Sequence, residues 1–175
     1  RSAYLRAIDH QEQSLAIARE IGDREREGNA LGNLGICYDS LGDYRRAVDH
    51  IEQSLAIARE IGDRYLESSG LVYLGLVYRD TGQSPLACKH FQDAIDIAEV
   101  TGDRENQHEA RFALALAQLY TGELAAARKS IDGARRYDFP ANTMAAWTAT
   151  GIIQLRQSEL VAASEAFARG LTEAD

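Results

Sequence analysis

The chain has 175 residues, of which 45% are hydrophobic and 26% charged, a balance that suits one domain or a short array of repeats. Its 27 acidic and 19 basic residues give a net charge of −8, which argues against a nucleic-acid-binding protein because such proteins neutralise phosphates with clustered Lys and Arg. No apolar run approaches the roughly 18 residues of a membrane span, and no signal-peptide pattern opens the chain. We therefore expect a cytoplasmic protein that does not bind membranes.

The first predicted element is a helix over 3–21, and its sequence returns later in the chain. The segment EQSLAIAREIGDR occurs twice without a change, at 12–24 and at 52–64. Shifted by forty residues, YLRAIDHQEQSLAIAREIGDR at 4–24 aligns with YRRAVDHIEQSLAIAREIGDR at 44–64 and with SPLACKHFQDAIDIAEVTGDR at 84–104. A fixed internal period of this size is typical of proteins built by stacking equivalent units.

Later elements are predicted as antiparallel helix pairs over 25–62, 64–102, 104–138 and 141–173. Apolar residues recur at three- and four-residue spacing, which indicates amphipathic helices. Glycines such as Gly62 can close one helix, and the aspartate that follows, Asp63, can cap the next. Pro85 and Pro140 fall at helix starts, where a missing N–H costs nothing. The expected fold is a single all-α array over 1–175 with about nine helices.

Each helix pair resembles the tetratricopeptide repeat, whose helix A carries Trp/Leu…Leu-Gly…Tyr and whose helix B carries Gly-x-Tyr-x-x-Ala…Tyr/Phe…Ala. The first pair matches this pattern at Leu31, Leu34, Gly35, Tyr38, Gly42, Tyr44, Ala47, Ile51, Ser54 and Leu55. The second matches it at Leu71, Leu74, Gly75, Tyr78, Gly82, Ala87, Phe91, Ala94 and Ile95. The third pair is weaker, with Arg111 and Gln118 at usually apolar positions, and the fourth fits the pattern with Ser158 in place of the turn glycine. The resemblance implies a right-handed superhelical solenoid.

The forty-residue step is longer than the ordinary period of about 34 residues in this family. Longer helices of this kind resemble the kinesin light chain, Pins-like polarity scaffolds and the sensor arrays of bacterial signalling NTPases. The step from Arg111 to Trp147 is shorter, at 36 residues. We therefore expect the geometry to change around 136–140.

Catalytic and metal sites are not expected. His10, His50 and His90 recur at one repeat position, but stacked helices lie about 8–10 Å apart, whereas zinc needs ligands near 2 Å. Cys37 and Cys88 have no metal or redox spacing and are interpreted as small core residues. No phosphate loop, nucleophile elbow or His-Glu metal motif occurs. We predict a non-enzymatic protein without a cofactor.

The resemblance implies that the first helices of the pairs line a concave groove. Carried over by register, the predicted groove residues are Asn29, Asn33, Ile36, Val72, Tyr73, Leu76, Arg79, Phe112, Leu116, Tyr120 and Ile152. This apolar strip with polar points suits an extended or helical peptide with apolar anchors. Alternatively, the same positions pack against adjacent repeats. The Lys and Arg of a chaperone-type carboxylate clamp are almost absent, which argues against an acidic chaperone tail as ligand.

The leading functional hypothesis is a scaffold that binds a protein or peptide in this groove. A second is the sensor segment of a larger bacterial signalling NTPase or transcriptional regulator. The unpaired helix 3–21 and the last predicted helix, with Phe167 and Leu171 but no polar cap, indicate a fragment of a longer protein. A third hypothesis is self-association, because a second copy could cover the unpaired terminal helix and give a homodimer.

Overall fold

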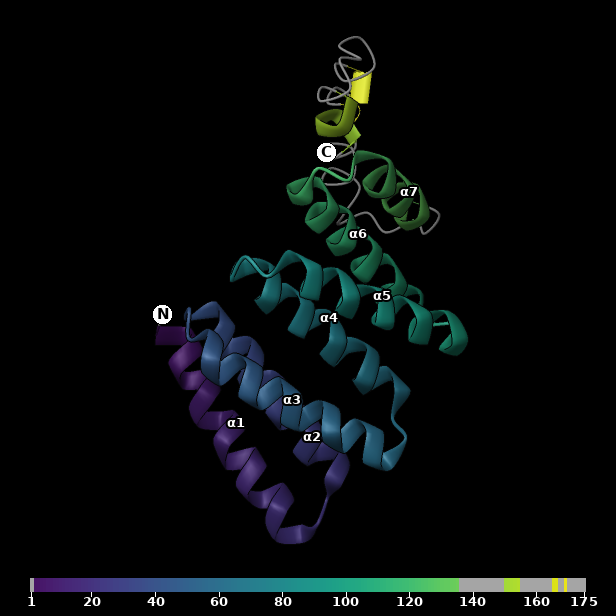
Figure 1. Ribbon diagram of the computed structural model, residues 1–175. Coiled ribbons are helices and arrows are strands. Elements are labelled where there is room, and N and C mark those ends of the chain that lie inside the picture. The colour runs from purple at the N-terminus through teal and green to yellow at the C-terminus, as the bar shows by residue number, and fades with distance from the viewer. Residues whose placement is uncertain (1, 136–149, 155–164, 167–168, 170–175) are drawn as a thin grey trace.

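The computed structural model describes residues 2–135, 150–154, 165–166 and 169, and the first of these ranges forms a row of helices joined by short turns (Figure 1). The helices are α1 (Ser2–Ile21), α2 (Arg24–Ser40), α3 (Tyr44–Ile61), α4 (Arg64–Asp80), α5 (Ser84–Thr101), α6 (Arg104–Thr121) and α7 (Leu124–Ala134). Residues 150–154 are also helical. The described residues contain no strand, so the all-α prediction is confirmed. The predicted change of geometry at 136–140 lies outside the described residues.

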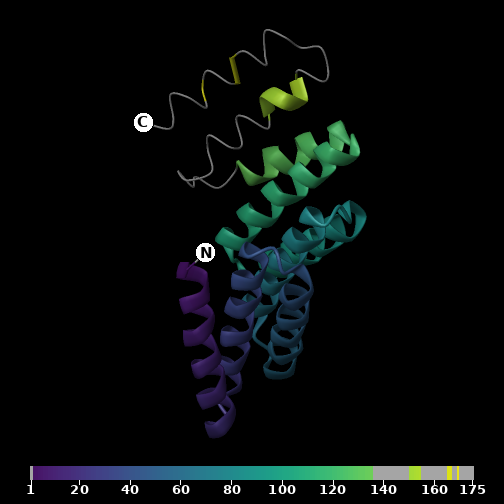
Figure 2. The ribbon, with the colours of Figure 1, turned by 90° about the vertical axis from the view of Figure 1, so that its left-hand side faces the viewer.

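Consecutive helices contact each other along the array, and the pairs α2/α3, α4/α5 and α6/α7 follow one another after α1 (Figure 2). The apolar side chains between these helices form one continuous core from Ile8 to Ala117. A second cluster includes Leu119, Ile131 and Ile153. Each pair therefore covers the apolar face of its neighbour, as the repeated sequence predicts. Along the described helices, none is both long and apolar enough to cross a membrane.

The turns between the helices depend on glycine and aspartate. Six glycines, one at each turn, have φ between +71° and +83°, a region that other residues enter at a steric cost. Asp63 follows one of them, and its side chain accepts a hydrogen bond from the backbone N–H of Leu66 at 3.0 Å. Asp23 and Asp103 cap α2 and α6 in the same way. These contacts satisfy N–H groups that the first helical turn leaves without a partner.

The Leu-Gly pairs of α2 and α4 allow each of these helices to approach its partner closely. A methyl group on Gly75 would lie 2.5 Å from Cε1 of Phe91, and one on Gly35 would overlap the side chain of Ile51. Phe91 and Ile51 are themselves almost fully buried, at 0% and 1% exposure. Glycine is therefore required at these positions by contact between helices.

The two identical segments each supply two arginines that bind one buried glutamate. Arg19 and Arg24 donate hydrogen bonds to the Glu27 carboxylate at 2.9 and 2.5 Å, and Glu27 is only 8% exposed. The second copy forms the same contacts with Arg59, Arg64 and Glu67. Each glutamate lies in the helix that follows its segment, so the repeated sequence fixes the junction between successive helices as well as the helix itself.

Candidate peptide-binding groove

The first helices of the pairs, α2, α4 and α6, form the face that carries the candidate groove. α4 contacts both α2 and α6 directly, whereas no such contacts join α3 to α5 or α5 to α7 among the described helices. The first helices are therefore closer together than the second helices. This difference curves the array and makes the face of α2, α4 and α6 concave.

One hollow lies between α2 and α4 and has a volume of about 380 Å³. Asn29, Asn33 and Ile36 line it from α2, and Tyr73 lines it from α4. Gly32 widens the hollow because it has no side chain to fill it. The side-chain amides of Asn29 and Asn33 are exposed and form no hydrogen bond to another described residue. They are therefore available to bind the backbone of a ligand.

A second hollow lies between α4 and α6 and has a volume of about 420 Å³. Its lining residues are Tyr65, Ser69, Tyr73, Asp103, Glu105, Asn106 and Glu109. Tyr65, Ser69 and Tyr73 line both hollows, which makes the two continuous across α4. The Asn106 amide donates hydrogen bonds to Ser69 Oγ at 2.9 Å and to Asp103 Oδ2 at 2.6 Å. These bonds fix one wall of the second hollow.

Carboxylates control the electrostatics of the second hollow. Burial raises the pKa of Glu109, and the neighbouring Glu105 carboxylate raises it further, with His108 acting in the opposite direction. Burial also raises the pKa of Tyr73, and the negative charges of Glu109 and Glu105 add to this effect. Both shifts show that negative charge is disfavoured there without a cation.

A further carboxylate lies near the C-terminal ends of α2 and α4. Burial raises the pKa of Asp39, the nearby Asp80 raises it further, and Arg79 lowers it. Arg79 forms an ion pair with Asp80 at 2.8 Å. The positive charge predicted for the groove at Arg79 is therefore already neutralised within the chain.

The structure brings several predicted groove residues together. Asn29, Asn33, Ile36 and Tyr73 line the α2/α4 hollow. Leu76, Phe112 and Leu116 are half-buried and pack at the edges of the core clusters, and Ile152 is also half-buried. Tyr120 is 79% exposed and lines neither hollow.

Val72 differs from the prediction. It is only 1% exposed and belongs to the main core, so it offers no surface to a ligand. Val72 occupies the repeat position of Gly32, on the flank of its helix that packs against neighbouring helices. The alternative interpretation, packing between repeats, holds at this position.

The sequence prediction did not include Tyr65, Glu105 or Asn106, which line the groove. Tyr65 and Glu105 share one repeat position, four residues before Ser69 and Glu109. An extension of the groove register by one helical turn toward the N-terminus of each first helix would have found both.

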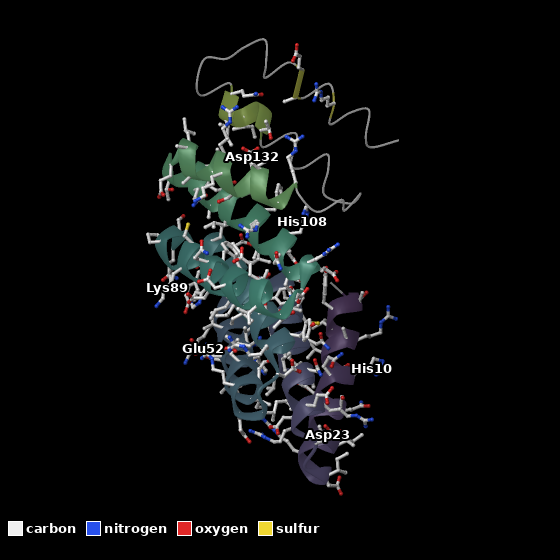
Figure 3. All side chains as sticks on the ribbon, turned by 90° about the vertical axis from the view of Figure 1, so that its right-hand side faces the viewer. His10, Asp23, Glu52, Lys89, His108 and Asp132 are labelled. Carbon is white, nitrogen blue, oxygen red and sulfur yellow. The ribbon has the colours of Figure 1, made fainter. Side chains whose placement is uncertain are left out.

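The recurring histidines lie on three different helices, His10 on α1, His50 on α3 and His90 on α5 (Figure 3 labels His10). Within the described ranges, no group of three or more His, Cys, Asp or Glu side chains is placed to hold a metal ion. The residues that line the two hollows carry amide, carboxylate, tyrosine and apolar side chains. Such a set suits recognition of a polypeptide.

The tetratricopeptide repeat family model matches residues 2–60 and 67–132. The chain therefore belongs to the tetratricopeptide repeat family, and its fold is the right-handed superhelical solenoid that the resemblance implied. A comparison with curated proteins found no match.

Solved structures of other repeat proteins share this fold. BtubC (BKLC) from P. vanneervenii has a TM-score of 0.83 and 20% identity, over 98% of this chain and 73% of that one. A STAND protein with a tetratricopeptide repeat sensor from Pyrococcus horikoshii has a TM-score of 0.80 and 20% identity, over 94% of this chain but 27% of that one. The Rap conjugation gene regulator of plasmid pLS20, in complex with the Phr* peptide, has a TM-score of 0.81 and 16% identity, over 99% of this chain and 49% of that one. The chain thus spans less than half of the last two proteins.

Proposed function

We propose that the concave face of α2, α4 and α6 binds an extended segment of another protein or a peptide, and that the chain acts as a scaffold without catalysis. The observation that carries this proposal is the continuity of the two hollows through Tyr65, Ser69 and Tyr73. Together they provide a groove rather than an enclosed cavity, which fits a chain better than a small compact molecule.

The chemistry of the groove supports an extended ligand. Asn29 and Asn33 can each donate to a backbone carbonyl and accept from a backbone N–H. Ile36, which lines the α2/α4 hollow, offers apolar surface to an anchoring side chain. The Phr* peptide complex of the pLS20 Rap regulator supports a peptide ligand for this fold. A cytoplasmic location is part of the proposal, and cell fractionation tests it.

Selection from a random-peptide phage library tests the proposal. Ile36→Glu should abolish binding of the selected peptides, because it places a charge on the apolar side of the α2/α4 hollow, and Asn33→Ala should weaken it. Leu86→Glu is the matched control, since Leu86 is 37% exposed on α5, outside the groove. Circular dichroism should show unchanged helicity in all three variants. Peptides that bind Ile36→Glu as tightly as the unchanged protein would refute the proposal.

The same groove would serve as the sensing surface of a larger regulator. The repeat sensor of the STAND protein from Pyrococcus horikoshii supports this alternative for the role of the array. The regulator hypothesis is tested by expressing the entire gene product and measuring whether a peptide selected by the array changes nucleotide hydrolysis or DNA binding. A gene product without such activities would dismiss it and leave the scaffold proposal in place.

Self-association through α1 is a second candidate function. Leu5, Ile17 and Ile21 are 50%, 56% and 61% exposed on this helix. The residue equivalent to Ile17 in the next repeat, Ile57, is 5% exposed because α2 covers it. A second copy could cover the face of α1 in the same way. Light scattering should then show a dimer that Ile17→Glu dissociates, whereas a mass that is independent of concentration and equal to one chain would exclude it.

A further inference from the structure

All charged residues that line the groove are acidic. Glu25 and Asp63 line the α2/α4 hollow, and Asp103, Glu105 and Glu109 line the α4/α6 hollow. No Lys, Arg or His is among the described residues that line either one. A concave surface with charge of one sign concentrates its potential within the groove and favours ligands of opposite charge.

The five carboxylates differ in their partners, and three of them, those of Glu25, Glu105 and Glu109, form no hydrogen bond or ion pair with a described residue. Asp63 and Asp103 accept hydrogen bonds from backbone N–H groups and serve as helix caps. In contrast, the carboxylates of Glu105 and Glu109 have no hydrogen bond or ion pair with any residue that the structure describes. Both lie on α6, four residues and about one helical turn apart, so they form neighbouring acceptors on one wall of the hollow.

Four glutamates outside the groove, Glu27, Glu60, Glu67 and Glu99, have arginine partners. Arg24 pairs with Glu27 and Glu60, and Arg111 of α6 pairs with Glu99. These arginines lie outside both hollows. Arginines thus pair with these glutamates between helices, whereas no arginine of the described residues pairs with the glutamates of the groove. A positively charged ligand could form ion pairs with these carboxylates.

We infer that the segment bound in the groove is cationic, and that one of its lysine or arginine side chains occupies the α4/α6 hollow between the Glu105 and Glu109 carboxylates. The inference rests on the proposed function and specifies the chemistry of its ligand. A volume of about 420 Å³ gives such a side chain enough room.

The aromatic side chains of the hollow suit this ligand. Tyr65 and Tyr73 line the same space as the two glutamates. A guanidinium group can accept both kinds of contact, since it binds carboxylates through a planar fork and stacks on aromatic rings. The burial that raises the pKa of Glu109 is consistent with this, because a bound cation would offset the loss of water around the carboxylate.

The ligand would then span both hollows. With its cationic side chain against α6, its backbone would continue across α4 to the free amides of Asn29 and Asn33. An adjacent apolar side chain would contact Ile36, which lines the far side of the α2/α4 hollow. We expect arginine to bind more tightly than lysine at the cationic position, because only arginine can use two acceptors and a ring face together.

Four sets of synthetic peptides test the inference. All positions are randomised except the central one, which is fixed as Arg, Lys, Gln or Glu, and binding is measured by fluorescence polarisation. The Arg set should bind about tenfold more tightly than the Gln set, the effect expected of a charged hydrogen bond. The Glu set should bind most weakly. The double variant Glu105→Gln/Glu109→Gln should lose this preference and bind the Arg and Gln sets with similar affinity.

A matched control separates the groove from the net charge of −8. Asp9 and Glu20 are exposed on α1 and line neither hollow. The double variant Asp9→Asn/Glu20→Gln changes the net charge by the same amount and should retain the full preference for Arg. Equal loss in both double variants would attribute the preference to overall charge and overturn the inference.

The remaining outcomes distinguish the inference from the proposed function. Equal binding of all four sets, still abolished by Ile36→Glu, would refute the cationic ligand and leave the groove as a binding site. No binding of any set would refute both. Higher salt should also weaken binding of the Arg set more than that of the Gln set, because screening acts on the charged pair alone.

Discussion

The hydroxyl of Ser54 on α3 donates a hydrogen bond to the backbone carbonyl of Gly28 on α2 at 2.7 Å. Both residues are buried, so the bond joins the two helices of a pair inside the core. In the next pair the donor is on the other helix, where Ser68 of α4 donates to the carbonyl of Ala94 on α5 at 3.2 Å. The repeats thus conserve the bond between helices while the residue that makes it changes.

Loss of this bond should have a measurable but moderate cost. Ser54→Ala removes the donor, whereas the Gly28 carbonyl keeps its place within α2. We expect the free energy of unfolding to fall by about 0.5–1.5 kcal/mol. Urea denaturation measures this change. Ser14→Ala is the matched control, because Ser14 occupies the same repeat position in α1 but is exposed. An equal effect of the two substitutions would contradict the role of the bond.

Arg59 and Glu67 should behave as a coupled pair. In the third copy of the repeated segment their positions are held by Glu99 and Gln107, and the Gln107 amide donates to the carbonyl of Ala98 at 2.8 Å. Arg59→Glu and Glu67→Gln should each destabilise the array by about 1–3 kcal/mol because each leaves a charged hydrogen bond unmade. The double variant should cost less than the sum. Additive costs in urea denaturation would show that the two residues act independently.

Acid should weaken the contribution of Glu27. Hydrogen bonds from Arg19 and Arg24 lower the pKa of this carboxyl below its ordinary value of 4.5. The folded state therefore holds the ionised form more strongly than the unfolded state does, and the stabilisation is complete above about pH 4.5 and lost as the pH falls through the lower folded pKa. Glu27→Gln should be less stable than the unchanged protein at pH 7. Thermal unfolding across this range should show the difference shrinking at low pH.

Gly35→Ala should destabilise the array although alanine favours helices. The added methyl group would overlap Ile51 in the core, and such overpacking costs about 1–3 kcal/mol. Gly133→Ala on α7 is the control, because a methyl group there meets only the flexible side chain of Arg111, at 3.2 Å. It should be neutral or gain up to about 1 kcal/mol from helix propensity. Thermal unfolding compares the two, and a stabilised Gly35→Ala would contradict the close contact.

Glu109→Gln should stabilise the free protein at neutral pH. The pKa of Glu109 is raised, so its ionisation above that pKa favours the unfolded state. We expect a gain below about 1 kcal/mol, since the side chain is partly exposed. The gain should vanish in acid, where the carboxyl is protonated in both states. A loss of stability at pH 7 would indicate a cationic partner for Glu109 within the protein and would count against an available carboxylate.

The helices and their turns could be predicted because their determinants are local. Gly62 and Asp63 mark one helix end and the next helix start in the sequence itself, and the forty-residue step repeats these signals. The burial of Val72 could not be predicted, because it depends on how closely α4 packs against its neighbours. Gly32, at the same repeat position, instead leaves a hollow, so register alone does not separate core from groove.

The groove register reaches Glu109, and Glu105 lies one helical turn before it, but the sequence pattern does not show that these two glutamates share a hollow with Tyr73. Glutamates on a helix surface are usually solvated, and only the placement of α4 beside α6 shows that Tyr73 covers this pair on one side. The sequence likewise does not show that the donor is Ser54 on the second helix of one pair and Ser68 on the first helix of the next. The partner carbonyl on the other helix must be known to recognise each bond.

The six positive-φ glycines leave open space where a side chain would begin, with no atom within 4 Å of an added Cβ. An L-residue is strained at these backbone angles, whereas a D-residue adopts them without steric strain. Chemical synthesis with D-alanine at the turns should therefore restrict the unfolded chain without disturbing any neighbour, adding about 0.4–1 kcal/mol at each site. D-alanine at the turns should therefore raise the resistance of the array to heat and proteases without changing the residues that line the groove.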